Sequence, residues 1–210
     1  MTKAGVAGGL SKLVPDHKFN MAATDKEIVA VRTGVVIADT LLAVNDLPKD
    51  KLLANMATIQ AGMKAIGAGG NIDATLDDLT ARISNDSIVR DELLKELDQM
   101  HQQILPEIVF NGGEKLVPLL QAGSWLEGSN LVASAILAAN KPEAGTNLLR
   151  QEVAVGYFLN YVQTQASTKP VSAQLEKTLL ALKDIAAKPT LTADDVQAVK
   201  DQTAQVLALL

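Results

Sequence analysis

The chain has 210 residues, of which 48% are hydrophobic, and it carries a formal net charge of −5 at pH 7. A chain of this length and hydrophobic content can bury a sizeable core, which excludes a disordered protein. The acidic balance excludes a general nucleic-acid binder, because no surplus of lysine and arginine is available to neutralise phosphates. The absence of cysteine excludes disulfides, thiolate chemistry and cysteine-ligated zinc.

The first twenty residues are expected to form an arm rather than a helix. Three glycines and one proline, at positions 5, 8, 9 and 15, interrupt any helical period. We expect residues 1–20 to be a flexible tether or a loosely packed strap, and residues 21–210 to form a single all-helical domain. His17 lies in the arm, where a lone histidine is expected to be solvated. No signal peptide is recognised, because the apolar run near the N-terminus is too short.

Two helices are predicted after the arm. Thr24 and Glu27 have the spacing of a capping box and precede a long apolar run. Asp46 is predicted to cap the next helix, with Pro48 in its first turn. That second helix has one apolar face, and a cluster of glycines at positions 67, 69 and 70 is predicted to end it.

Two further helices are predicted between residues 71 and 105. The first has apolar residues at positions 72, 76, 79 and 83 on one face, and Thr75 with Asp78 is its predicted cap. The second has an apolar inner face and a charged outer face, which is typical of a helix that borders solvent. Pro106 and the glycines at 112 and 113 are expected to bound a separate short segment, PEIVF.

The stretch at residues 114–139 is predicted to be the central helix. It is apolar around its whole circumference, so other helices must surround it, and its many small residues allow neighbouring backbones to come close. Its length also resembles a membrane span. However, Pro118, Gln121, Glu127 and Asn130 lie inside it, and they make insertion into a bilayer unfavourable.

The last seventy residues are predicted to form three helices. The first covers residues 142–166 and is expected to pair in antiparallel fashion with the central helix, because the connection is short. Pro170 begins the second. Thr192 and Asp195 form a predicted capping box for the third, with Leu191 and Val196 as a hydrophobic staple.

No segment shows the alternating pattern of a strand. The sequence therefore predicts an all-α fold, an antiparallel multi-helix bundle of about seven to eight helices with a buried central helix pair.

Four charged residues in apolar surroundings are candidates for a buried polar network: Arg32, Asp39, Glu127 and Glu152. They could line a functional pocket, or they could form an internal ion pair, in which Glu127 or Glu152 would be the natural partner of Arg32. In the second case, removing Arg32 would leave a buried charge unpaired and destabilise the fold by about 3 to 5 kcal/mol.

Three aromatic residues, Trp125, Tyr157 and Tyr161, are candidates for lining a ligand pocket, and a hydrogen-bonded edge of the core is the alternative. No catalytic motif is present in the sequence. Asp98 and His101 have the spacing of half a helical metal site, but the chain has only two histidines, so no metal site and no cofactor are predicted.

The sequence thus predicts a non-enzymatic helical-bundle protein that binds a protein partner of unknown identity or serves as a scaffold. Lack of cysteine fits a periplasmic or otherwise exported protein, and neither nucleic acid nor a transmembrane segment is expected. The alternative is a carrier or sensor that binds an apolar or amphipathic small molecule in an interhelical pocket. An enzyme that uses buried carboxylates is the third hypothesis.

Overall fold

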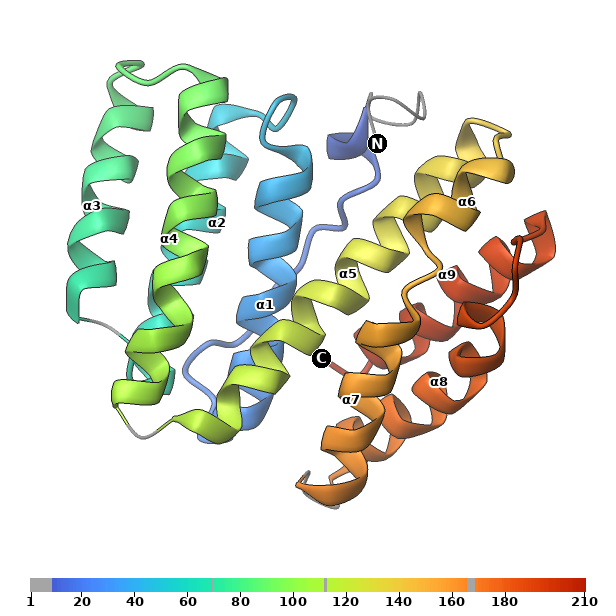
Figure 1. The fold of residues 1–210 in the computed structure, drawn as a ribbon. Coiled ribbons are helices and arrows are strands. Elements are labelled where there is room, and N and C mark those ends of the chain that lie inside the picture. The colour runs from blue at the N-terminus through green and yellow to red at the C-terminus, as the bar shows by residue number, and fades with distance from the viewer. Residues whose placement is uncertain (1–8, 69, 112, 166–168) are drawn as a thin grey trace. The chain divides into compact units, whose positions relative to one another are not determined.

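The computed structural model describes residues 9–68, 70–111, 113–165 and 169–210. These residues form nine α-helices, two short 3-10 helices and no strand (Figure 1). The predicted all-α helical bundle is confirmed. The α-helices are α1 (Lys26–Ala43), α2 (Lys49–Ile66), α3 (Gly70–Ser84), α4 (Arg90–Phe110), α5 (Val117–Ala138), α6 (Glu143–Leu148), α7 (Glu152–Thr164), α8 (Pro170–Ala186) and α9 (Ala193–Leu207), and the 3-10 helices are η2 (Leu10–Lys12) and η3 (Glu114–Leu116).

Among the described helices, none has both the length and the hydropathy that a membrane span requires. The chain divides into two compact units. The N-terminal unit comprises residues 14–125, and the C-terminal unit comprises residues 126–210 together with residues 9–13. Because α5 runs through the boundary, the single domain predicted for residues 21–210 stays a prediction.

In the N-terminal unit, α1 to α4 pack one against the next, and α1 also contacts α4. Asp25 caps α1, because its Oδ1 accepts a hydrogen bond of 3.1 Å from the backbone N–H of Glu27. The capping box predicted at Thr24 is therefore wrong by one residue. The side chain of Arg90 donates to the carbonyl oxygens of Val44 and Leu47, at 2.9 Å each, and so satisfies one group at the end of α1 and one in the connection to α2.

Two predicted features of α2 and α3 are confirmed and two are wrong. Gly67 ends α2 with a φ of 92°, a conformation that glycine adopts without strain. The four apolar positions of α3 are all buried. Asp46 does not cap α2, whose N-cap is Pro48, and Thr75 lies inside α3 because that helix already begins at Gly70.

The helix α4 is longer than predicted. It continues through Pro106 to Phe110, whereas we expected proline to separate a short segment. Proline lacks an N–H and so removes one helical hydrogen bond, but tertiary packing keeps the last turn helical: Ile104 and Ile108 are both almost fully buried.

Close backbone contact joins α1 to the first half of α5. A Cβ atom at Gly34 would overlap the carbonyl oxygen of Leu120, and one at Gly123 would overlap the carbonyl oxygen of Val31. The hydroxyl of Ser124 donates to the carbonyl oxygen of Gly34 at 2.8 Å. The small residues of the central helix thus permit the close approach that the sequence predicted.

In the C-terminal unit, α7 packs against α8 and α8 against α9. The single helix predicted over residues 142–166 is wrong, because residues 149–151 separate α6 from α7. The capping box of Thr192 and Asp195 at the start of α9 is confirmed, and both residues of the predicted staple are buried. The side chain of Asn130 ties α5 to α9 by donating to the carbonyl oxygen of Lys200 at 3.0 Å.

Candidate functional site

A strap formed by residues 14–24 lies along α1 in the N-terminal unit (Figure 1). It runs antiparallel to α1, since His17 lies beside Asp39 while Asn20, further along the strap, contacts Arg32 near the start of the helix. The arm predicted for residues 1–20 is thus a strap over its second half. Residues 1–8 lie outside the described part of the chain.

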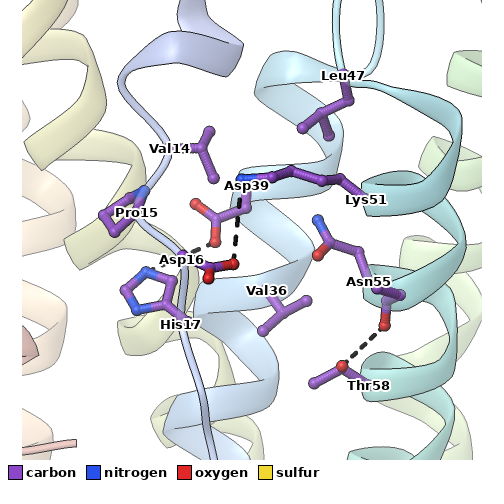
Figure 2. Close-up of a pocket in the computed structure, with 11 residues that line it drawn as sticks. Val14, Pro15, Asp16, His17, Val36, Asp39, Leu47, Lys51, Asn55 and Thr58 are labelled. Atoms are coloured by element: carbon purple, nitrogen blue, oxygen red, sulfur yellow. Dashed lines mark hydrogen bonds and ion pairs between the residues drawn. The ribbon is translucent and has the colours of Figure 1, made fainter.

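Between the strap, α1 and α2 lies a cavity of about 90 Å³, drawn in Figure 2. His17 and Asp39 face each other at one side of it, with 3.6 Å between Nε2 and Oδ2. This distance exceeds a good hydrogen bond but allows an ion pair when the imidazole is protonated. Asp39 is only 2% exposed, and the side chain of His17 is 16% exposed. The expectation that His17 is solvated is therefore wrong.

The other wall of this strap cavity comes from α2. Lys51 lies 4.0 Å from Asp16 of the strap, and both side chains are largely exposed, so this ion pair is weak. Asn55 donates to the hydroxyl of Thr40 at 3.1 Å, and this hydroxyl donates to the carbonyl oxygen of Val36. Polar groups from the strap, α1 and α2 therefore line the strap cavity together with apolar side chains such as Val14, Val36 and Leu47.

The size of the strap cavity decides what can occupy it. A volume of about 90 Å³ accommodates several water molecules. Pockets for drug-sized ligands have about 300 Å³ or more. The strap cavity is therefore too small for the amphipathic ligand of the carrier hypothesis.

Arg32 is half-buried and lies under the strap. Its Nη1 donates to the carbonyl oxygen of Asn20 at 2.9 Å, and its guanidinium carbon lies 5.8 Å from the centre of the Phe19 ring. Partial burial lowers the pKa of Arg32, and the negative charge of Asp25 opposes this effect. Arg32 is thus less buried than the sequence predicted, because its long side chain reaches the strap at the surface.

The three carboxylates predicted to be buried have different environments. Asp39 and Glu127 are buried, as expected, with exposed fractions of 2% and 0%. Glu152 is exposed, so its predicted burial is wrong. The reason is local: the break before α7 places Glu152 in the first helical turn, where a carboxylate is favoured by the helix dipole and remains hydrated.

The three aromatic candidates belong to different units. Trp125 is half-buried at the end of the N-terminal unit, whereas Tyr157 and Tyr161 lie on α7 in the C-terminal unit. Tyr157 is 47% exposed and meets the ring of Phe158 edge-on, with 5.2 Å between ring centres. Their role in lining a ligand pocket stays a prediction. The pair Asp98 and His101, for which no metal site is predicted, lies partly outside the described part of the chain, because the side chain of His101 is not described.

A second candidate site lies at the C-terminal end of α4. The side chain of Phe110 is 89% exposed and borders an open groove of about 570 Å³. Residues of the last three turns of the helix line this α4 groove: Gln102, Gln103, Pro106, Glu107, Phe110 and Asn111. Because Pro106 has no N–H, the carbonyl oxygen of Gln102 lacks its usual helical donor. The α4 groove therefore combines an exposed aromatic ring with amide and carbonyl groups.

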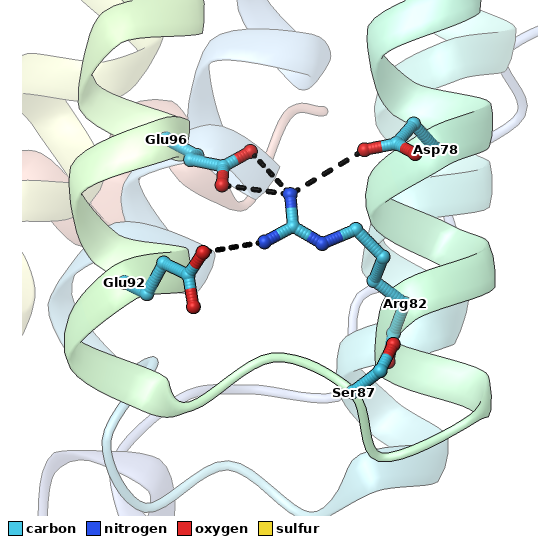
Figure 3. Close-up of polar contacts among 5 residues, drawn as sticks. All are labelled: Asp78, Arg82, Ser87, Glu92 and Glu96. Atoms are coloured by element: carbon cyan, nitrogen blue, oxygen red, sulfur yellow. Dashed lines mark hydrogen bonds and ion pairs between the residues drawn. The ribbon is translucent and has the colours of Figure 1, made fainter.

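Beyond the groove, one arginine bridges α3 and α4 with ion pairs. Arg82 of α3 donates to both carboxylate oxygens of Glu96, at 2.7 and 2.9 Å, and to Glu92 at 2.6 Å, as Figure 3 shows. Asp78, one turn before Arg82, lies 3.4 Å away. The hydrogen bond to Glu96 is the main reason that the pKa of Arg82 is raised. The cluster neutralises part of a surface rich in carboxylates.

Sequence reasoning named Asp39, which lines the strap cavity, but missed the other residues of that cavity and the whole α4 groove. The sequence predicts residues 106–110 to be a separate short segment, bounded by Pro106 and the glycines at 112 and 113. A helix over the same residues places Ile108 inward and Phe110 outward. For His17, no local signal distinguishes a packed strap from a solvated arm.

Comparison of the chain with protein-family models, with curated proteins and with solved structures finds no match in any of the three.

Proposed function

We propose that the protein is a non-enzymatic helical scaffold that binds a protein partner at the α4 groove. The exposure of Phe110 supports this proposal. Leaving an aromatic side chain 89% exposed to water is unfavourable, and its burial against a partner would be favourable. Aromatic residues are also enriched in the cores of protein interfaces. Val109 beside it is also exposed, at 44%.

The class of ligand follows from the form of the α4 groove. The groove is open along one helix and is bordered by side-chain amides and by the exposed ring of Phe110. This form suits an extended or helical polypeptide segment, whereas a small molecule is usually bound in an enclosed pocket. The sequence contains no catalytic motif that would support an enzymatic function. An exported location is part of the proposal and is supported by the lack of cysteine, which avoids unpaired thiols in an oxidising compartment.

Site-specific photo-crosslinking tests the proposed function. A benzophenone amino acid replaces Phe110 in one variant and Val153 of α7, which is 87% exposed, in a matched control. In cells of the natural source, we expect the probe at position 110 to form an adduct with one polypeptide, which excess unlabelled protein removes and the control does not form. Fractionation of the same cells checks the location.

Two results would contradict the proposal. One is the absence of any polypeptide adduct from position 110. The other is a bound compound of low mass in native mass spectrometry of the gently purified protein, which would favour the carrier hypothesis instead.

A further inference from the structure

The charge of the molecule is concentrated in the α3–α4 hairpin, residues 70–110. This hairpin contains nine acidic and three basic residues, which gives a net charge of −6, while the remaining 15 acidic and 16 basic residues give +1. The whole net charge of −5 therefore comes from about a fifth of the chain. A surface with this imbalance attracts cationic partners and repels anionic ones.

Basic side chains neutralise only part of this charge, and among them Lys49 of α2 lies 2.8 Å from Asp86 of the hairpin. Arg82 is engaged by the carboxylates of its own cluster, and Arg90 donates to backbone carbonyls at the end of α1. The third basic residue of the hairpin, Lys95, is exposed on α4. Exposed acidic side chains accompany it on the same helix, among them Asp91 and Asp98.

From this charge distribution and the α4 groove we infer that the partner contributes a basic amphipathic segment, with an aliphatic side chain against Phe110 and lysine or arginine side chains along α4. The inference rests on the proposed function and adds the chemistry of the partner. From Asp91 to Phe110 the helix extends about 28 Å at 1.5 Å per residue, so a partner helix of about five turns spans the surface.

The same charge argues against other occupants. A second copy of this chain carries a net charge of −5 at pH 7 and would be repelled, as would nucleic acid and anionic lipid surfaces. A cationic polypeptide gains from long-range attraction before contact, and Phe110 then supplies an apolar anchor once the partner is docked.

Peptide binding to the full-length protein tests the inference. The probe is a fluorescein-labelled peptide of about 18 residues with leucine and lysine at helical spacing, and the matched probe has glutamate in place of every lysine. Fluorescence anisotropy is measured at low and at physiological salt. We expect the lysine probe to bind, the glutamate probe not to bind, and the affinity to fall as salt increases.

Three variants separate the contributions. Phe110→Ser is expected to weaken binding of the lysine probe about tenfold, because it removes the apolar anchor. Lys95→Glu is expected to strengthen binding several-fold at low salt, because it removes the exposed positive charge. Val153→Ser, an equally exposed apolar residue on α7, is expected to leave binding unchanged. Circular dichroism confirms that each variant is folded.

Equal binding of both probes, no binding of the lysine probe, or weaker binding by Lys95→Glu would overturn the inference. Its failure is distinguishable from failure of the proposed function. A polypeptide adduct at position 110 together with no lysine-probe binding would leave the scaffold function standing and remove only the basic partner. Loss of the adduct would remove both.

Discussion

Asp195 stabilises the first turn of α9 and the loop before it. Its Oδ2 accepts from the backbone N–H of Thr192 at 2.9 Å, and its Oδ1 accepts from Nζ of Lys188 at 2.5 Å. The hydrogen bond from Lys188, followed by that from Thr192, lowers the pKa of Asp195 below its ordinary value. The side chain is 8% exposed, so these contacts are shielded from water.

The lowered pKa of Asp195 predicts a pH-dependent contribution to stability. Because the pKa is lower in the folded than in the unfolded state, the contribution is present above the unfolded value of about 4 and is lost as pH falls through the folded value. We expect Asp195→Asn to lower the free energy of unfolding by about 1 kcal/mol at pH 7 and to have a diminishing effect below about pH 4. Urea denaturation across this range is the measurement. Asp194→Asn, at the exposed neighbouring position, is the control, and a constant difference at all pH values would contradict the assignment.

Replacing Arg32 should destabilise the fold less than the sequence predicted. Its guanidinium is half-buried and bonds to a strap carbonyl that water can reach after substitution. Arg32→Ala should therefore lower the free energy of unfolding by about 1 kcal/mol rather than the 3 to 5 kcal/mol of an orphaned buried charge. Chemical denaturation measures the difference, with Arg32→Lys as a variant that retains the charge. A loss above about 3 kcal/mol would show that Arg32 neutralises a buried carboxylate.

At the level of elements, the contact between α1 and α5 depends on the absence of two side chains. Gly34 and Gly123 each face a backbone carbonyl of the other helix, so neither can be enlarged without separating the helices. The side chain of Ser124 adds a hydrogen bond across the same contact. The backbone itself therefore forms this part of the core.

Substituting these glycines should distinguish the effect of packing on stability from the effect of helix propensity. Gly34→Ala and Gly123→Ala are each expected to lower the free energy of unfolding by about 2 to 3 kcal/mol through overpacking. Gly156 on α7 has no atom near the position of a Cβ. Gly156→Ala is therefore expected to raise stability by about 0.5 to 1 kcal/mol, since alanine is the better helix former.

Thermal and urea unfolding of the three glycine variants provide the comparison. Similar effects at all three positions would show that helix propensity, and not contact between α1 and α5, governs them.

For the whole molecule, the uneven distribution of charge has a consequence for solubility. Near the isoelectric point of about 5.0 the net charge of the molecule is close to zero, and the hairpin, with its excess of acidic residues, is then still negative while the rest of the chain is positive. Copies of the molecule then attract one another, and solubility should pass through a minimum near pH 5. Static light scattering as a function of pH measures this.

Salt provides the control for that prediction. Electrostatic attraction between copies is screened, so added sodium chloride should reduce the scattering near pH 5. Scattering that increases with salt would indicate apolar association instead, with the exposed Phe110 and Val153 as the first residues to replace.

Local sequence determined most of the helices of this protein. A hydrophobic spacing of 3.6 residues can be recognised without knowing which elements pack together in space. The apolar stripe of α3, the end of α2 at Gly67 and the capping box of Thr192 and Asp195 are of this kind, because each depends on groups close to one another in the sequence. The same local chemistry predicted burial of Asp39 and Glu127, since each lies in an apolar run.

Only the tertiary structure decided which polar and aromatic groups lie at the surface. Exposure depends on which element packs against a residue, and spacing along the chain does not contain that information. Packing of the strap on α1 shields His17 from water, and the break before α7 exposes Glu152. The helix α4 continues past Pro106 because its last turn buries Ile108, which leaves Phe110 in water. The residues that carry the proposed function were therefore set by packing between elements rather than by local propensity.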